Sequence, residues 1–259
     1  MIRFGNSTNY WIQSNDTFDI SRGAKKKYLL KSNNYKLAFD PERTAIIIAD
    51  MQNFFISEKL GRNHKGSKLV EPIRKAVKHA RGLGMRIVWL NWGVRADMVN
   101  IPPGISRIFY HAGTEMGKEL PDGLGLNLVK GSWSAEIIPE LKEIVEPEDI
   151  QIEKNRVSGF FGTELQQTLV NLDIKTLFFA GINTDQCVMG TLQDAHGYGY
   201  DCILLEDCTA TASPDFSYQS VIYNVNKMGF ITNTDYFCNG EFKYNEIDSW
   251  VNQQIYYHS

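Results

Sequence analysis

The sequence lacks long hydrophobic runs, and its longest apolar stretches have the length of single β-strands. A membrane-spanning helix needs about 20 consecutive apolar residues, so no transmembrane segment is expected. The N-terminus carries Arg3, Asn6 and Asn9 where a signal peptide has its apolar core. These absences predict a soluble protein that works in the cytoplasm.

The sequence also lacks a strong excess of charge of one sign, because its formal net charge is -3 at pH 7. The run from Lys25 to Lys27 is shorter than the roughly five to eight basic residues of a nucleic-acid-binding patch. Neither nucleic acid nor a membrane surface is therefore expected as a partner. A small molecule is the expected partner.

Cysteine and histidine are scarce and scattered. Four cysteines occur without CxxC spacing or neighbouring histidines: Cys187, Cys202, Cys208 and Cys238. None of the five histidines directly follows a predicted strand: His64, His79, His111, His196 and His258. This pattern predicts neither a disulfide framework nor a zinc site, so no metal is expected.

Two sequence motifs of α/β enzymes are absent. A dinucleotide-binding domain requires G-x-G-x-x-G after its first strand, but the first predicted strand is followed by Asp50-Met51-Gln52-Asn53. The G-x-S-x-G elbow of serine hydrolases does not occur either. We therefore expect no cofactor, and cysteine remains as the candidate nucleophile.

From residue 44 onward, short apolar segments alternate with segments of helical period. The predicted strands are 44–49, 86–90, 150–153, 177–180, 202–205 and a short strand near Ile231. The predicted helices are 69–80, 134–145, 165–172, 188–195 and 213–229. This alternation predicts an α/β fold, a doubly wound, mainly parallel six-stranded sheet in a three-layer α/β/α arrangement.

We divide the chain into an N-terminal extension, residues 1–42, and one domain, residues 43–259. The extension is polar and has no sustained period, but its aromatic residues argue against disorder. It is expected to pack on the domain or on a neighbouring subunit, and we expect a homo-oligomer, either a dimer or a tetramer. Residues 91–128 are predicted to form a long loop, a kind of segment that is usually functional or disordered.

A candidate nucleophile lies between a predicted strand and a predicted helix. The strand 177–180 ends at Gly181, and Cys187 falls in the first turn of the following helix. The positive end of a helix dipole favours a thiolate over a thiol there. Free cysteines are often only core residues, but this one lies at the carboxyl end of a strand, where ligands bind in open α/β sheets.

An acid and a lysine follow two other predicted strands. Asp50 ends the strand 44–49, where its alternative role is that of a turn or cap residue. Lys154 ends the strand 150–153 and supplies a fixed positive charge that would keep nearby groups ionised and oriented.

Three segments together resemble the isochorismatase-like cysteine hydrolases. These are the cysteine segment GINTDQCVMGT, residues 181–191, the strand-and-acid segment AIIIADMQN, residues 45–53, and the lysine segment EKNRVSGF, residues 153–160. The resemblance extends over about residues 43 to 235. It implies a sheet order of 3-2-1-4-5-6, which leaves one strand between Asp50 and Lys154. Either the lysine side chain reaches across that strand, or the strand count is wrong by one.

The resemblance also implies a catalytic triad of Asp50, Lys154 and Cys187. Since no histidine adjoins a predicted strand end, aspartate is the expected base, and Cys187 is the thiol expected to react before the other cysteines. Backbone N–H groups of Asn183 and Cys187 are the expected oxyanion hole. The peptide bond between Ile182 and Asn183 is expected to be cis.

The resemblance leaves the substrate open. The sequence lacks the D-x-H spacing of the nicotinamidase metal site, and Phe54 replaces an aspartate that is frequent in the family. Isochorismatases hydrolyse a vinyl ether without a cysteine nucleophile, so Cys187 favours cleavage of a C–N bond in an amide, ureido or carbamoyl compound through a thioester. Isochorismate hydrolysis is the alternative, and a non-catalytic scaffold is a third reading.

Three residues near the predicted strand ends are candidate walls of the substrate pocket: Phe55, Asn91 and Trp92. Arg95 is a further candidate for binding a substrate carboxylate, but exposed arginines are common and a surface position is favoured.

Overall fold

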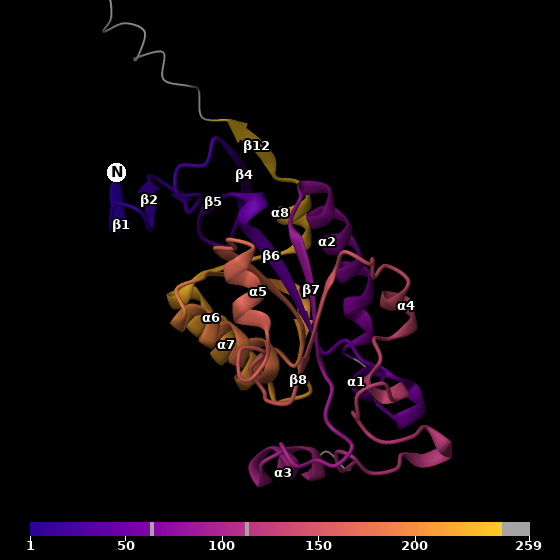
Figure 1. Ribbon diagram of the computed structural model, residues 1–259. Coiled ribbons are helices and arrows are strands. Elements are labelled where there is room, and N and C mark those ends of the chain that lie inside the picture. Colours follow the sequence, from indigo (N-terminus) through magenta and orange to yellow (C-terminus); the bar gives the residue numbers. More distant parts are fainter. Residues whose placement is uncertain (63–64, 112–113, 245–259) are drawn as a thin grey trace, which may run out of the picture.

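A six-stranded parallel sheet forms the centre of the computed structural model, which describes residues 1–62, 65–111 and 114–244 (Figure 1). The strands lie in the order β11-β10-β9-β6-β7-β8, and neighbouring strands are parallel. Their bounds are β6 Thr44–Ala49, β7 Arg86–Trp92, β8 Ile150–Lys154, β9 Thr176–Ile182, β10 Asp201–Ala210 and β11 Phe230–Thr232. Counted within this sheet, the order is the predicted 3-2-1-4-5-6.

Helices cover both faces of this sheet, which confirms the predicted three-layer architecture (Figure 1). Ile46 and Ile48 of β6 pack in one core with residues of α2, α4 and α8, whereas Ile47 packs in another core with residues of α5, α6 and α7. The helices are α1 Asn53–Ile56, α2 Val70–Leu83, α3 Pro103–His111, α4 Pro139–Lys142, α5 Leu165–Asn171, α6 Met189–Gly197, α7 Asp215–Met228 and α8 Thr234–Cys238. Within the described ranges, no helix combines the length and the apolar composition needed to cross a bilayer.

The two central strands, β6 and β9, are buried along their whole length. Strands covered on both faces have no solvent-facing positions, which explains their continuous apolar sequences. Gly181 lies where the two strands approach each other at their carboxyl ends. Its φ is +104°, and a Cβ atom there would lie 2.0 Å from the carbonyl oxygen of Ala49. Only glycine permits this approach, which brings the end of β9 next to Asp50.

The N-terminal extension forms most of a second six-stranded sheet, with the order β1-β2-β3-β5-β4-β12. Its strands are β1 Ile2–Gly5, β2 Tyr10–Ser14, β3 Thr17–Asp19, β4 Lys26–Lys31, β5 Lys36–Phe39 and β12 Glu241–Tyr244. The expectation of a segment without sustained period missed these strands. They are short and mostly exposed or half-buried, so each contains too few residues for a clear alternation.

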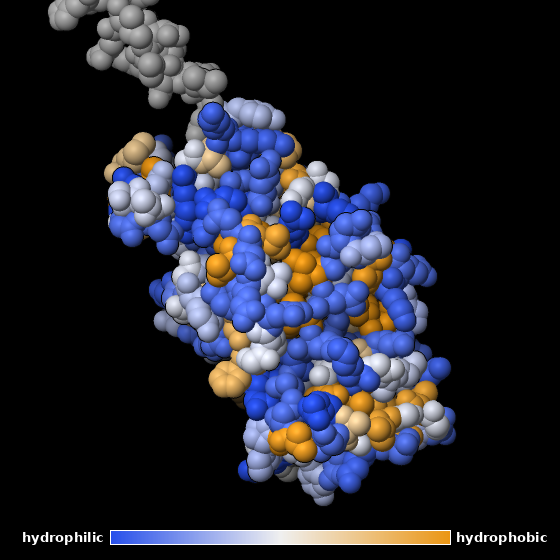
Figure 2. Space-filling model, in the orientation of Figure 1, coloured by the Kyte–Doolittle hydropathy of each residue, from blue (hydrophilic) through white to orange (hydrophobic). Residues whose placement is uncertain are grey.

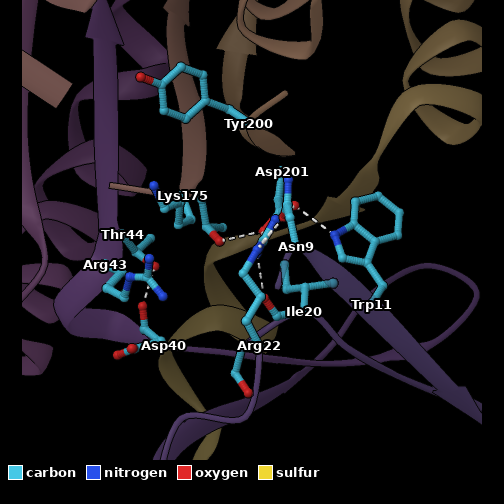
Figure 3. Close-up of polar contacts among 12 residues, drawn as sticks. Asn9, Trp11, Ile20, Arg22, Asp40, Arg43, Thr44, Lys175, Tyr200 and Asp201 are labelled. Atoms are coloured by element: carbon cyan, nitrogen blue, oxygen red, sulfur yellow. Dashed lines mark hydrogen bonds and ion pairs between the residues drawn. The ribbon is translucent and has the colours of Figure 1, made fainter. Parts of the chain in front are cut away.

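A buried carboxylate joins the second sheet to the main sheet (Figure 3). Asp201, the first residue of β10, accepts hydrogen bonds from Trp11 Nε1 at 2.6 Å and from Arg22 Nη1 and Nη2 at 2.6 and 2.8 Å. Thr176 Oγ1, at the start of β9, donates to the same carboxylate at 2.9 Å. The side chains of Arg22 and Asp201 are only 6% and 2% exposed. This cluster therefore holds residues from β2 and the loop after β3 against the amino ends of β9 and β10.

Replacing Asp201 with asparagine is expected to lower the free energy of unfolding by about 3 kcal/mol, because the Arg22 guanidinium would remain buried without a counter-charge. Urea denaturation measures the change. Asp16→Asn is the matched control, since it breaks the exposed Asp16–Lys36 pair and should change stability little. Equal midpoints for the two variants would show that the buried pair does not anchor the second sheet.

Two local predictions in the domain were wrong. Residues 91–128, expected to form a loop, contain α3, which begins at Pro103 as helices with an early proline often do. Residues 134–145, expected to form one helix, contain only the turn Trp133–Ala135 and the short α4. The chain between them is extended because it hydrogen-bonds to the segment after β6, through Asn53 N to Glu136 O and Ile138 N to Met51 O.

Candidate active site

Asp50, Lys154 and Cys187 lie together at the carboxyl edge of the main sheet. Asp50 directly follows β6, Lys154 is the last residue of β8, and Cys187 lies in a π-helical turn, Thr184–Val188, that follows β9 and continues into α6. Lys154 Nζ is 3.0 Å from Asp50 Oδ2 and 3.3 Å from Cys187 Sγ. The ammonium group thus contacts both the acid and the thiol.

The lysine side chain reaches Asp50 across β7, which pairs with β6 on one side and with β8 on the other. The strand count was therefore correct. Lys154 Nζ lies 3.8 Å from the ring centroid of Trp92, the last residue of β7. Lys154 is fully buried, so the aromatic face and the Asp50 carboxylate replace its hydration.

The backbone of Asp50 turns sharply at the end of β6. Its φ is 54°, a left-handed conformation that aspartate tolerates better than most residues. The Asp50 N–H donates to Leu90 O at 2.9 Å, and the Asp50 carbonyl accepts from Gln52 N at 2.8 Å. These bonds fix the direction of the carboxyl group.

The Asp50 carboxylate is suited to accept a proton. Burial raises its pKa above the ordinary value, and the positive charge of Lys154 partly opposes this effect. Hydrogen bonds from the Lys154 ammonium and the Cys187 thiol also lower this pKa, but burial has the largest effect. A buried carboxylate gains from taking up a proton, and the thiol beside it can supply one.

The expectation that the helix dipole would favour a Cys187 thiolate was wrong. Burial, reinforced by the neighbouring Asp50 charge, raises the pKa of Cys187 to about 12, although Lys154 acts in the opposite direction. The Cys187 residue is only 6% exposed, so the loss of hydration outweighs the partial charge of a helix terminus. Cys187 therefore rests as a thiol and needs a base.

Gln52, which the sequence analysis did not identify, holds the ends of β6 and β7 together. Its Nε2 donates to Trp92 O at 2.7 Å and to Ala135 O at 2.6 Å, and its Oε1 accepts from Trp92 N at 2.9 Å. Gln52 is fully buried, so all these bonds are shielded from water. The polar pair Gln52-Asn53 between the apolar Met51 and Phe54 is the signal that marks it in the sequence.

The thiol opens into a cavity of about 420 Å³. Its walls are largely apolar and include Phe54, Phe55, Trp92 and, from α3, Ile108 and Phe109. Figure 2 shows hydrophobic residues gathered at the lower end of the molecule, where Figure 1 places α3 beyond the sheet. α3 therefore covers the cavity with one face and leaves Ile108 partly exposed.

Two of the three candidate pocket residues line this cavity. Phe55 and Trp92 do, whereas Asn91 lines a separate cavity of about 690 Å³ along the outer edge of β8. Trp92 borders both cavities. The structure therefore does not bring Asn91 to the thiol cavity, where the prediction placed it.

The arginine in the cavity is Arg62, in the segment after α1, and not Arg95. Arg95 pairs with Asp97 at 2.5 Å on the surface, with 62% of its side chain exposed. Sequence reasoning missed Arg62 because it belongs to no motif and follows no strand.

No group of three or more His, Cys, Asp or Glu side chains in the described ranges is placed to hold a metal ion. His64 and His258, named in the sequence analysis, lie outside these ranges.

The sequence of this chain is similar to those of known proteins. The model of the isochorismatase domain matches residues 44–235. The ureidoacrylate amidohydrolase RutB of Cronobacter sakazakii is 34% identical over 210 residues, which cover 78% of this chain and 90% of that protein. The corresponding protein of Rhizobium rhizogenes is 32% identical over 210 residues, covering 78% of this chain and 85% of that protein.

Solved structures show the same fold. The N-carbamoylsarcosine amidase of Thermoplasma acidophilum is 26% identical, with a TM-score of 0.57 over 74% of this chain and 97% of that one. An isochorismatase family protein of Desulfovibrio vulgaris is 25% identical, with a TM-score of 0.63 over 74% of this chain and 95% of that one.

Proposed function

The chain belongs to the isochorismatase family, and from this premise we propose that it is a cysteine amidohydrolase. It cleaves a C–N bond in a small amide, ureido or carbamoyl compound through a thioester on Cys187. The observation that carries the proposal is the position of Lys154 Nζ, 3.0 Å from Asp50 Oδ2 and 3.3 Å from Cys187 Sγ. A base, a nucleophile and a fixed cation in contact are the groups that acyl transfer requires.

In the first half-reaction, the Asp50 carboxylate takes the thiol proton while Cys187 Sγ forms a bond to the substrate carbonyl carbon. The ammonium group of Lys154 stabilises the negative charge that develops on sulfur. The tetrahedral intermediate then breaks its C–N bond, and the proton on Asp50 passes to the leaving nitrogen. Ammonia or an amine departs, and the acyl group remains on sulfur as a thioester.

In the second half-reaction, a water molecule gives a proton to Asp50 as its oxygen attacks the thioester carbonyl carbon. The C–S bond breaks, and the proton on Asp50 returns to sulfur as the acid product leaves. This step regenerates the neutral thiol, in agreement with the pKa of about 12 that burial gives Cys187.

Oxyanion stabilisation is assigned to the backbone N–H groups of Asn183 and Cys187. Both residues line the cavity, and the Ile182–Asn183 peptide bond is cis. The carbonyl of Asn183 accepts hydrogen bonds from Gln186 N at 3.1 Å and Val188 N at 3.2 Å, which hold the turn in place. Donors fixed in this way need no rearrangement when charge forms on the carbonyl oxygen.

Hydrolysis of the vinyl ether of isochorismate is the alternative reaction, and it requires only acid catalysis by Asp50. Cleavage of a C–N bond is favoured because an amide needs a strong nucleophile, and Cys187 lies beside both its base and its cation. The names of two relatives, ureidoacrylate amidohydrolase and N-carbamoylsarcosine amidase, specify substrates of the proposed class.

A screen for released ammonia tests the proposal. The purified protein is incubated with primary amides, ureido acids and carbamoyl amino acids, and separately with isochorismate. We expect ammonia from at least one ureido or carbamoyl compound, at a rate that a chelator does not change. Consumption of isochorismate, with no ammonia from any amide or ureido compound, would establish the alternative.

A further inference from the structure

Arg62 places a guanidinium group in the wall of the thiol cavity. Arg62 forms no ion pair with any described residue, and its Nε is buried without a hydrogen-bond partner among them. Its guanidinium carbon lies 4.5 Å from the ring centroid of Phe54, so it packs against the aromatic face. Arginine stays protonated in proteins, so this group is a cation inside the cavity.

None of the described residues that line the cavity balances this charge. Among its described lining residues there is no aspartate or glutamate, and the polar side chains are those of Asn183 and Gln186. The buried Asp50 is already paired with Lys154. Arg62 is half-buried, so its cation is partly withdrawn from water without a counter-charge, and a bound anion would stabilise it.

The remaining walls limit the shape of such an anion. Four aromatic rings enclose the space, with Phe54 and Phe55 at 4.8 Å between centroids and Trp92 and Phe109 at 5.0 Å. A volume of about 420 Å³ is near the small end of the range for ligand sites. The ligand that fits carries one anionic end and a short, apolar or planar body.

We propose that Arg62 binds the carboxylate of the substrate, so that the substrate is a small amido or ureido acid. The planar guanidinium matches a carboxylate in shape and donates charge-assisted hydrogen bonds to it. The amide or ureido carbonyl then lies at Cys187 while the carboxylate lies at Arg62. This assignment of the substrate class rests on the proposed amidohydrolase function.

A binding experiment tests the assignment without turnover. The Cys187→Ser variant is titrated calorimetrically with ureido acids, namely N-carbamoylglycine, N-carbamoyl-β-alanine and N-carbamoyl-4-aminobutyrate. Each is compared with the alkylurea in which an isopropyl group replaces the carboxylate. We expect at least one ureido acid to bind about 10- to 100-fold more tightly than its alkylurea, the size expected for a hydrogen bond to a charged group.

Adding Arg62→Ala should remove this preference, and Arg62→Lys should retain part of it, because the charge stays but the planar pair of donors is lost. Arg95→Ala is the matched control, since it removes an arginine from the surface outside the cavity and should leave the preference unchanged. Arg62→Lys also keeps the test valid if the alanine variant does not fold. A preference that survives Arg62→Ala, or no preference for the carboxylate anywhere in the series, would overturn the assignment.

The two proposals fail in different ways. If a ureido acid binds in an Arg62-dependent way but the parent protein releases no ammonia from any compound, then Arg62 binds the carboxylate and the proposed reaction is wrong. If ammonia is released at equal rates from a ureido acid and its alkylurea, then the proposed reaction is correct and Arg62 does not recognise the carboxylate.

Discussion

The Cys187→Ala variant is expected to lose about 10⁴-fold or more in kcat for ammonia release, because Cys187 is the one nucleophile among the described residues that line the cavity. Alanine leaves the backbone N–H groups and the cavity walls in place, so substrate binding should persist. Stopped-time ammonia assays measure the loss. Intact-protein mass spectrometry of acid-quenched parent enzyme should show an acyl adduct, and peptide mapping should place it on Cys187.

Cys238→Ala is the matched control for this prediction. Cys238 is half-buried and lies outside the thiol cavity, so its removal should leave kcat nearly unchanged. Cys202 and Cys208 are less suitable controls, since both are fully buried and their loss would leave voids in the core. Ammonia release by Cys187→Ala within about tenfold of the parent rate would remove the thiol from the mechanism.

The Asp50→Asn variant is expected to lose about 10³- to 10⁴-fold in kcat/KM, because the amide is nearly the same size as the carboxyl but cannot take the thiol proton. The double variant Asp50→Asn/Cys187→Ala should be little worse than Cys187→Ala alone, since the two groups act in one step. Asp97→Asn, which changes an exposed acid paired with Arg95, is the control. Near-parent activity in Asp50→Asn would exclude Asp50 as the base.

The parent enzyme should show a matching pH dependence. The active form of Asp50 is the carboxylate, so kcat/KM should fall as the pH falls through the pKa of this group. Because burial raises that pKa above the ordinary 3.8, the midpoint should lie above 3.8. Activity that stays constant down to pH 3.8 would contradict an aspartate base in this environment.

Much of the main domain could be predicted from the sequence for a simple physical reason. A strand such as β9, buried on both faces, must be apolar at every position, and the helices beside it must be apolar on one face. The carboxyl ends of parallel strands meet at one edge, so residues at or just beyond the ends of β6, β8 and β9 were expected to be neighbours. The prediction failed where the pattern is weak, in the short strands of residues 1–42 and in α3.

The hydrophobic period of the sequence by itself determined the strands, the helices and the α/β class. The order of the strands and the meeting of Asp50, Lys154 and Cys187 at the sheet edge were expected from the resemblance of three segments to the isochorismatase-like hydrolases. The tertiary structure alone decided the resting state of the thiol and the sign of the charge in the pocket. Burial raises the pKa of Cys187, against the expectation from its place before a helix, and Arg62 lines the cavity where Arg95 does not. Desolvation and proximity depend on which atoms surround a group in space, and spacing along the chain does not contain that information.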